Sequence, residues 1–227
     1  DADTAVAPYM FAGCTSLEEI EYFGTTVPDG MFYNCTALSS VTLPDGLTYI
    51  GENAFAGTAV TSLTLPDGNV SVGANAFAGT PLTTLTLSAG SVIDTASLTP
   101  FADCASFASV VVEAGNTRYA AEGGILYNAA KTELVLLPPA VGDFTLPDTV
   151  TRIGAGAFAG RRDIGSLDLS GITEIGAYAF AGSNLTSIAI PASVTEIAEG
   201  AFYNCTSLRT VTIAEGVTGI DDYAFYG

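Results

Sequence analysis

A phenylalanine returns every 21 to 24 residues along most of this chain, usually directly after an alanine. The members of the series are Phe11, Phe32, Phe55, Phe77, Phe101, Phe158, Phe180, Phe202 and Phe225. A fixed period of this length predicts a solenoid, in which one small unit per repeat stacks on its neighbours. We therefore expect a single domain over residues 1–227, with the phenylalanines stacked in its core.

A second repeated block carries apolar residues at its first, fourth and sixth positions. Copies include Leu38–Leu43, Val60–Leu65, Leu82–Leu87, Ile164–Leu169 and Leu185–Ile190. Because the last apolar positions alternate with polar ones, the block predicts a β-strand with one buried face. Eight copies in one register predict a continuous parallel sheet.

Turn residues separate these strands from a second apolar segment. Pro-Asp-Gly follows the strand blocks at Pro44–Gly46 and Pro66–Gly68, where proline ends the strand and glycine suits the turn. Tyr49–Ile50 then predicts a short strand on another face. The few residues around each repeat phenylalanine leave room only for a 3₁₀ turn or a single α-turn, with the ring pointing inward.

The combination Ile-Gly-x-x-Ala-Phe-x-x-Cys-x-x-Leu-x-x-Ile-x-Leu-Pro carries a family resemblance, with good copies at Ile50–Thr58 and Thr195–Leu208. It resembles the BspA-like leucine-rich repeats of bacterial cell-surface proteins, over about nine tenths of the chain. The resemblance implies a right-handed leucine-rich repeat solenoid of short parallel strands and short helical turns. It also implies an exported, surface-attached protein that adheres to host proteins or to other cells.

The period fails between Phe101 and Phe158. We expect sub-arrays at 1–112 and 145–227, separated by an insert at 113–144. Two apolar runs in the insert, Gly124–Tyr127 and Glu133–Leu137, predict a β-hairpin. Similar islands in the family carry Asn-x-x-Tyr and Gly-x-Leu-Tyr elements, matched here by Asn116, Tyr119, Gly124, Leu126 and Tyr127. The insert is either a junction between sub-arrays, which its apolar character favours, or a protruding ligand loop.

Charge and composition exclude several kinds of function. The net charge of −18 disfavours nucleic acid and anionic lipid as partners, and no segment is long and apolar enough to insert into a membrane. The chain contains no histidine, which excludes histidine-dependent catalytic triads and metal sites. The acidic clusters Glu18–Glu21 and Asp221–Asp222 have no basic neighbour. We therefore expect no enzymatic activity, no metal and no cofactor.

The four cysteines, Cys14, Cys35, Cys104 and Cys205, all lie three residues after a repeat phenylalanine. Other repeats hold Thr58, Thr80 or Ser183 at this position, which predicts a small, partly buried slot. Neighbouring side chains in a stack point in parallel rather than toward each other, so we expect free thiols.

The outward side chains of the strand blocks form the candidate binding site, which we call the strand face. The concave sheet of a leucine-rich repeat is the usual docking surface for a protein. The candidate residues are Glu18, Glu19, Glu21, Ser40, Thr42, Ser62, Thr64, Thr84, Thr86, Ser166, Asp168, Ser187, Arg209, Thr210 and Thr212.

These features predict a monomeric, extracellular or cell-surface module for protein interaction or adhesion, with a host or bacterial surface protein or glycan as its partner. A structural stalk that spaces another domain from the cell is an alternative. A carbohydrate-binding or carbohydrate-active domain is a second one. The chain lacks an initiator methionine and ends two residues after Phe225, so we expect it to be a piece of a longer protein.

Overall fold

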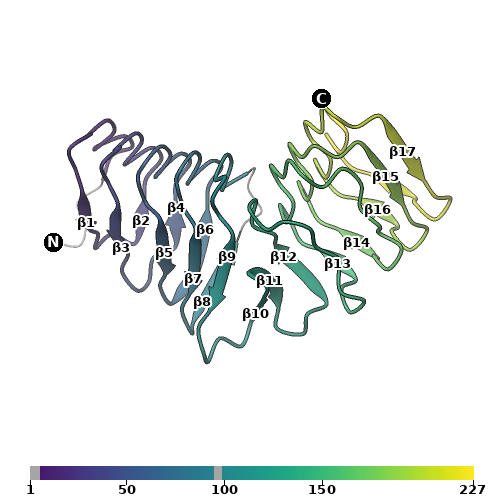
Figure 1. The fold of residues 1–227 in the computed structure, drawn as a ribbon, viewed down its shortest axis with the longest axis horizontal. Helices are drawn as coiled ribbons and strands as arrows, with labels where there is room; N and C mark the ends of the chain where they lie inside the picture. Colours follow the sequence, from purple (N-terminus) through teal and green to yellow (C-terminus); the bar gives the residue numbers. More distant parts are fainter. Residues whose placement is uncertain (1–5, 95–98) are drawn as a thin grey trace.

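The computed structural model describes residues 6–94 and 99–227 and confirms the predicted solenoid. The chain winds through about nine coils, and each regular coil carries a repeat phenylalanine, a strand on one face and a second strand on another. The coils form an N-terminal and a C-terminal array (Figure 1). The arrays meet between β9 (Ser109–Val112) and β12 (Glu133–Leu136), a region that we call the junction.

Parallel strands build the strand face, as predicted, but not as one continuous sheet. The strands are β1 (Glu19–Glu21), β3 (Ser40–Thr42), β5 (Ser62–Leu65), β7 (Thr84–Leu87), β9 (Ser109–Val112), β15 (Ser187–Ile190) and β17 (Thr210–Ile213). They divide into the sheets β1-β3, β5-β7-β9 and β15-β17. In β5, Leu63 and Leu65 are buried and Ser62 and Thr64 are exposed, which is the alternation that the sequence predicts.

The prediction of a strand at 164–169 is wrong. Gly165 has a left-handed φ of 51°, and the Asp168 carboxylate accepts a hydrogen bond from the Ser170 amide at 2.9 Å. Both features turn the backbone away from an extended path. On this face β9 is the last strand before these residues and β15 is the next strand along the chain.

Strands of two to five residues form the second face. One sheet contains β2 (Thr26–Val27), β4 (Tyr49–Ile50), β6 (Gly68–Val72) and β8 (Ser91–Asp94), all parallel. The other begins with β10 (Tyr119–Glu122), β11 (Ile125–Asn128) and β12 (Glu133–Leu136). It continues with β13 (Arg152–Ile153), β14 (Glu174–Ile175), β16 (Glu196–Ile197) and β18 (Gly219–Ile220). The second short strand of each coil is thereby confirmed.

The insert is a three-stranded antiparallel meander rather than a two-stranded hairpin. The expected strands β11 and β12 pair with each other, and β10 adds to the free side of β11. On its other side β12 pairs in parallel with β13, so the meander is the first part of the C-terminal sheet. The insert packs into the solenoid instead of protruding as a separate loop.

The repeat phenylalanines stack face to face inside the coils. In the N-terminal array Phe55 and Phe77 have ring centroids 5.4 Å apart and planes within 5°. In the C-terminal array Phe180 and Phe202 lie 5.2 Å apart with planes within 1°. The aromatic core is confirmed: its inner rings are buried, and the two end members, Phe11 and Phe225, are partly buried.

The backbone around each phenylalanine forms tight turns, and no helix is assigned within residues 6–94 and 99–227. In the coil of Phe55, Asn53 has a φ of 55° and Gly57 has a φ of 71°. Left-handed residues two positions before and two positions after the ring interrupt any helical run. The expected 3₁₀ or α-turn is therefore replaced by a succession of tight turns, closed by hydrogen bonds from the amides of Ala54, Ala56 and Thr58 to the carbonyl oxygens three residues earlier.

The buried apolar residues form two clusters, one in each array. Strand β11 contributes to both: Leu126 packs into the N-terminal cluster, and Ile125 and Tyr127 pack into the C-terminal one. The insert therefore joins the two cores through side chains on opposite faces of the same strand.

Candidate functional site

The strand face presents mainly hydroxyl groups to solvent. Most of its candidate residues are exposed, and Thr84, Thr86 and Ser187 are half-buried. A hollow of about 450 Å³ lies over β3 and β5, lined by Ser40, Thr42, Ser62 and Thr64. The structure therefore brings together the middle members of the predicted set around one depression.

Thr84 and Thr86, on β7, pair with Ser62 and Thr64 beside this hollow, and the remaining candidates are not part of its lining. Glu19 and Glu21 are exposed on β1, at the edge of the first sheet. Ser166 and Asp168 are exposed but, as corrected above, lie on irregular backbone instead of a strand. Ser187 is in β15, and Thr210 and Thr212 in β17 follow Arg209, all in the C-terminal array. The predicted site is thus divided by the junction into two separate parts.

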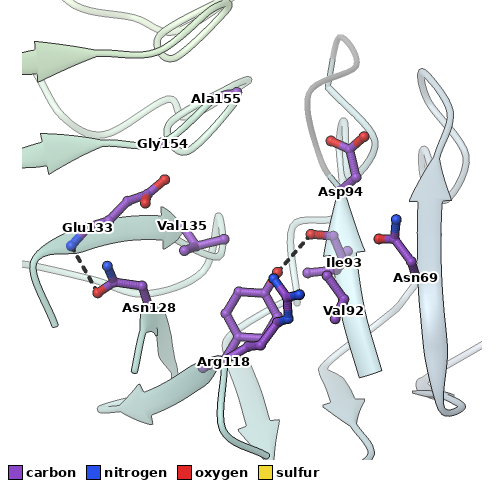
Figure 2. Close-up of a pocket in the computed structure, with 11 residues that line it drawn as sticks. Asn69, Val92, Ile93, Asp94, Arg118, Asn128, Glu133, Val135, Gly154 and Ala155 are labelled. Carbon is purple, nitrogen blue, oxygen red and sulfur yellow. Dashed lines mark hydrogen bonds between the residues drawn. The ribbon is translucent and has the colours of Figure 1, made fainter. Parts of the chain in front are cut away.

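A second depression, of about 700 Å³, lies between β8 and the insert (Figure 2). Figure 2 shows Glu133 and Asn128 on one side of it and Ile93 and Asp94 on the other. Arg118 is the positively charged residue among those that line this depression. Sequence reasoning did not find this depression, because its lining comes from segments that are far apart in the chain and do not repeat.

The Asn-x-x-Tyr element caps the edge of β8 beside this depression. The Asn116 side-chain amide donates to the carbonyl oxygens of Ser88 and Ser91, at 2.9 and 3.0 Å. The Tyr119 hydroxyl donates to the Ile93 carbonyl at 3.0 Å, and burial raises the pKa of this tyrosine. Two side chains thereby replace hydrogen bonds that a neighbouring strand would make.

Arg161 lies on the other side of the junction and is almost completely buried. Its guanidinium donates to the carbonyl oxygens of Pro138 and Val141, both at 2.7 Å, and pairs with Asp163. Arg161 is three residues after Phe158, in the slot that holds Cys, Thr or Ser in the other coils. An arginine where the other coils carry a small residue marks an unusual coil, and a comparison of the slot residues in the sequence would have found it.

The small slots of the regular coils hold hydroxyl and thiol groups against the phenylalanine turns. Thr80 donates to the Phe77 carbonyl at 2.8 Å, and Cys104 donates to the same oxygen at 3.0 Å. All four cysteines are free thiols, of which Cys14 is exposed. Burial raises the pKa of Cys35, Cys104 and Cys205, which keeps these thiols protonated.

Among the residues that the structure describes, no group of three or more acidic, cysteine or histidine side chains is arranged to hold a metal ion. Within the same residues no helix is long and apolar enough to cross a membrane.

Stacked coils with parallel strands, inward phenylalanines and an exposed strand face define a leucine-rich repeat solenoid. The chain belongs to the family of BspA type leucine rich repeat regions, which matches in six copies over residues 25–123 and 140–227. The family named from the sequence motif is therefore confirmed. No curated protein sequence is significantly similar to this chain.

Solved structures of bacterial leucine-rich repeat proteins share the fold. A leucine-rich repeat protein of Eubacterium ventriosum is 23% identical, with a TM-score of 0.66 over 91% of this chain and 66% of that one. A leucine rich cell surface protein of Faecalibacterium prausnitzii is 29% identical, with a TM-score of 0.59 over 96% of this chain and 53% of that one. The pneumococcal vaccine antigen PcpA is 18% identical, with a TM-score of 0.52 over 90% of this chain and 65% of that one. The chain thus spans about half to two thirds of the length of these proteins.

Proposed function

We propose that this chain is an extracellular or cell-surface module for protein interaction, which docks an adhesion partner on its strand face. The observation that carries this proposal is the hydroxyl-lined hollow over β3 and β5, on a surface whose strands are held rigidly by the stacked core. Short hydroxyl side chains lose little conformational entropy on binding and both donate and accept hydrogen bonds. The partner is a surface protein or glycan of a host or of another bacterium.

Family membership supports the location and the non-catalytic role. The Faecalibacterium protein, 29% identical, is described as a cell surface protein. A solenoid that fills its interior with stacked phenylalanines uses its outer surface for contacts rather than for an enclosed reaction site. Strand-face residues such as Thr64 and Thr86 contact a partner through hydrogen bonds and shape, and no group of this face is assigned to bond making or breaking.

Binding to a panel of purified matrix proteins, mucins and immobilised glycans, followed by biolayer interferometry, tests the proposal. The substitution Thr64→Arg places a long charged side chain in the hollow and should abolish binding of the partner that the panel reveals. Thr36→Arg puts the same side chain on an exposed turn away from the hollow and is the matched control.

Each possible result bears on the proposal. Loss of binding in Thr64→Arg alone supports the strand face as the docking site. Equal binding by the wild type and both variants assigns the contact to another surface. A chain that binds no member of the panel favours the stalk, which needs no ligand of its own.

A further inference from the structure

Four tyrosines gather on the turn edge of the C-terminal coils, at the side where the phenylalanine turns stack. Tyr203 lies edge-on to Tyr178 at 6.2 Å and is stacked with Tyr226 at 5.3 Å. Tyr223 in turn lies edge-on to Tyr226 at 5.9 Å. Tyr178 and Tyr203 are half-buried, whereas Tyr223 and Tyr226 are 59% and 58% exposed. Tyr178 and Tyr203 are each followed by a further coil and still remain partly exposed, and partly exposed aromatic pairs of this kind are typical of recognition surfaces.

Two of these rings stand on left-handed backbone. Tyr178 has a φ of 55° and Tyr223 a φ of 59°, at a position that is left-handed in every described coil and that asparagine or glycine fills in most of them, as in Asn75 and Gly156; Tyr9 and Thr99 are the other exceptions. A bulky residue with positive φ is a genuine outlier and is retained where the surroundings or a function require it. A Cβ on Gly200 would lie only 2.2 Å from a ring carbon of Tyr178, so the neighbouring coil leaves room for this ring.

Acidic groups surround the rings without a neutralising partner of opposite charge. The Tyr178 hydroxyl donates to the Glu199 carboxylate at 2.8 Å, which raises the pKa of the tyrosine. Asp221 and Asp222 are exposed directly before Tyr223. None of the ion pairs found among the described residues involves these three acids.

The N-terminal array contains a similar pair of rings with a different acid beside it. Tyr9 lies edge-on to Tyr33 at 6.5 Å, and its ring also covers a glycine, Gly30. The acid at the position of Glu199 is Asp29, whose carboxylate accepts hydrogen bonds from the Glu52 amide at 2.9 Å and from Tyr49 at 3.3 Å. This carboxylate holds neighbouring coils together, whereas Glu199 is exposed.

We propose that Tyr178, Tyr203, Tyr223 and Tyr226, with Glu199, form a binding surface, the tyrosine edge, for a basic segment of a partner protein. Arginine and lysine bind to tyrosine faces through cation–π attraction and are drawn to nearby carboxylates. The surplus of acids around the rings matches this partner better than a neutral sugar. The tyrosine edge is separate from the strand face, so this proposal stands or falls independently of the one above.

A fluorescent peptide of four Arg-Gly repeats, titrated at low and at physiological salt and followed by anisotropy, tests the inference. The combined variant Tyr178→Asn, Tyr203→Ala gives each position a residue that other coils already carry there, Asn75 and Ala78. It should bind the peptide about tenfold more weakly, because two ring faces are lost. The matched variant Tyr9→Asn, Tyr33→Ala should change affinity less than about twofold.

Two milder variants keep the test valid if the double variant unfolds. Glu199→Gln should weaken binding and flatten its salt dependence, while Tyr178→Phe, which retains the ring, should bind nearly as tightly as the wild type. Equal binding by the wild type and the C-terminal double variant would overturn the inference. So would binding of a peptide with citrulline in place of arginine at wild-type strength, or capture of a neutral glycan through the same tyrosines without capture of the arginine peptide. Thr64→Arg, in contrast, should leave peptide binding unchanged and thus separates this surface from the strand face.

Discussion

The regular coils and the junction solve the same packing problem in different ways. In a regular coil the same residue types recur at the same positions, so Phe77 stacks on Phe55, and slot residues such as Thr58 and Thr80 donate to the phenylalanine carbonyls. At the junction, Phe107 covers Phe101 at 47° and Phe144 covers Phe158 at 42°. The aromatic stack is therefore interrupted at the junction, where a tilted ring covers the last ring of each array.

The backbone hydrogen bonds differ in the same way. Regular coils pair strand with strand, whereas at the junction Asn116, Tyr119 and Arg161 bond to backbone carbonyls that a further coil would have satisfied. A solenoid can thus change its repeat where individual side chains make the hydrogen bonds that paired strands make elsewhere. The comparison predicts that the regular coils depend on apolar stacking and the junction on specific polar contacts.

Removal of a ring from a regular stack should have the largest effect. Phe180→Ala deletes a fully buried side chain with a stacked ring on both sides, Phe158 at 4.8 Å and Phe202 at 5.2 Å. We expect a loss of about 3–5 kcal/mol in the free energy of unfolding, measured by urea titration with circular dichroism. Phe23→Ala is the control, because Phe23 is 77% exposed and should change stability by less than about 0.5 kcal/mol.

The half-buried ring at the junction sharpens this comparison. Phe144 packs at a tilt on Phe158 and is only partly covered, so Phe144→Ala should cost clearly less than Phe180→Ala. An equal loss in the two variants would contradict the view that the aromatic stack matters most inside the regular coils.

Arg161 should stabilise the junction through its polar contacts rather than through apolar stacking. Arg161→Met keeps an apolar stem but leaves the carbonyl oxygens of Pro138 and Val141 without their buried donor. We expect a loss of about 1–3 kcal/mol in the free energy of unfolding. Arg162→Met removes the exposed ion pair with Asp103 and should cost less than about 1 kcal/mol. If the two arginine variants were equally stable, the junction would not depend on buried polar contacts.

This contrast also explains how much the sequence could predict. The phenylalanine stack and the short strands were predictable because each contact is made by two copies of the same residue type one period apart. The roles of Arg161 and Phe144 were not, because each partner occurs once and lies across the insert. The strand at 164–169 was wrongly predicted because the repeat pattern is present there, but the left-handed Gly165 and the turn at Asp168 interrupt the extended backbone. The strand face was assigned from the pattern alone, whereas the hollow within it depends on how β3 and β5 lie side by side.

A single hydrogen bond at the junction should have a smaller effect. Tyr119→Phe removes only the hydroxyl that bonds to the Ile93 carbonyl at 3.0 Å and leaves the ring in place. The expected loss is about 1 kcal/mol, measured by thermal or urea unfolding. Tyr33→Phe is the control, because no hydrogen bond of the Tyr33 hydroxyl is found among the described residues. A loss in Tyr33→Phe as large as that in Tyr119→Phe would show that the cap on β8 contributes nothing specific.

The slots of the regular coils can be compared without any substitution, through the reactivity of their cysteines. Cys35, Cys104 and Cys205 are buried, and burial raises the pKa of each thiol, which lowers the fraction of reactive thiolate at neutral pH. Cys14 occupies the same slot in the first coil but is exposed. In the native protein an aromatic disulfide reagent should therefore modify one cysteine rapidly and the other three only as the coils open; in urea all four should react at once. Mass spectrometry of the modified peptides identifies the fast site, and rapid labelling of Cys104 in the native state would contradict a closed slot beside the junction.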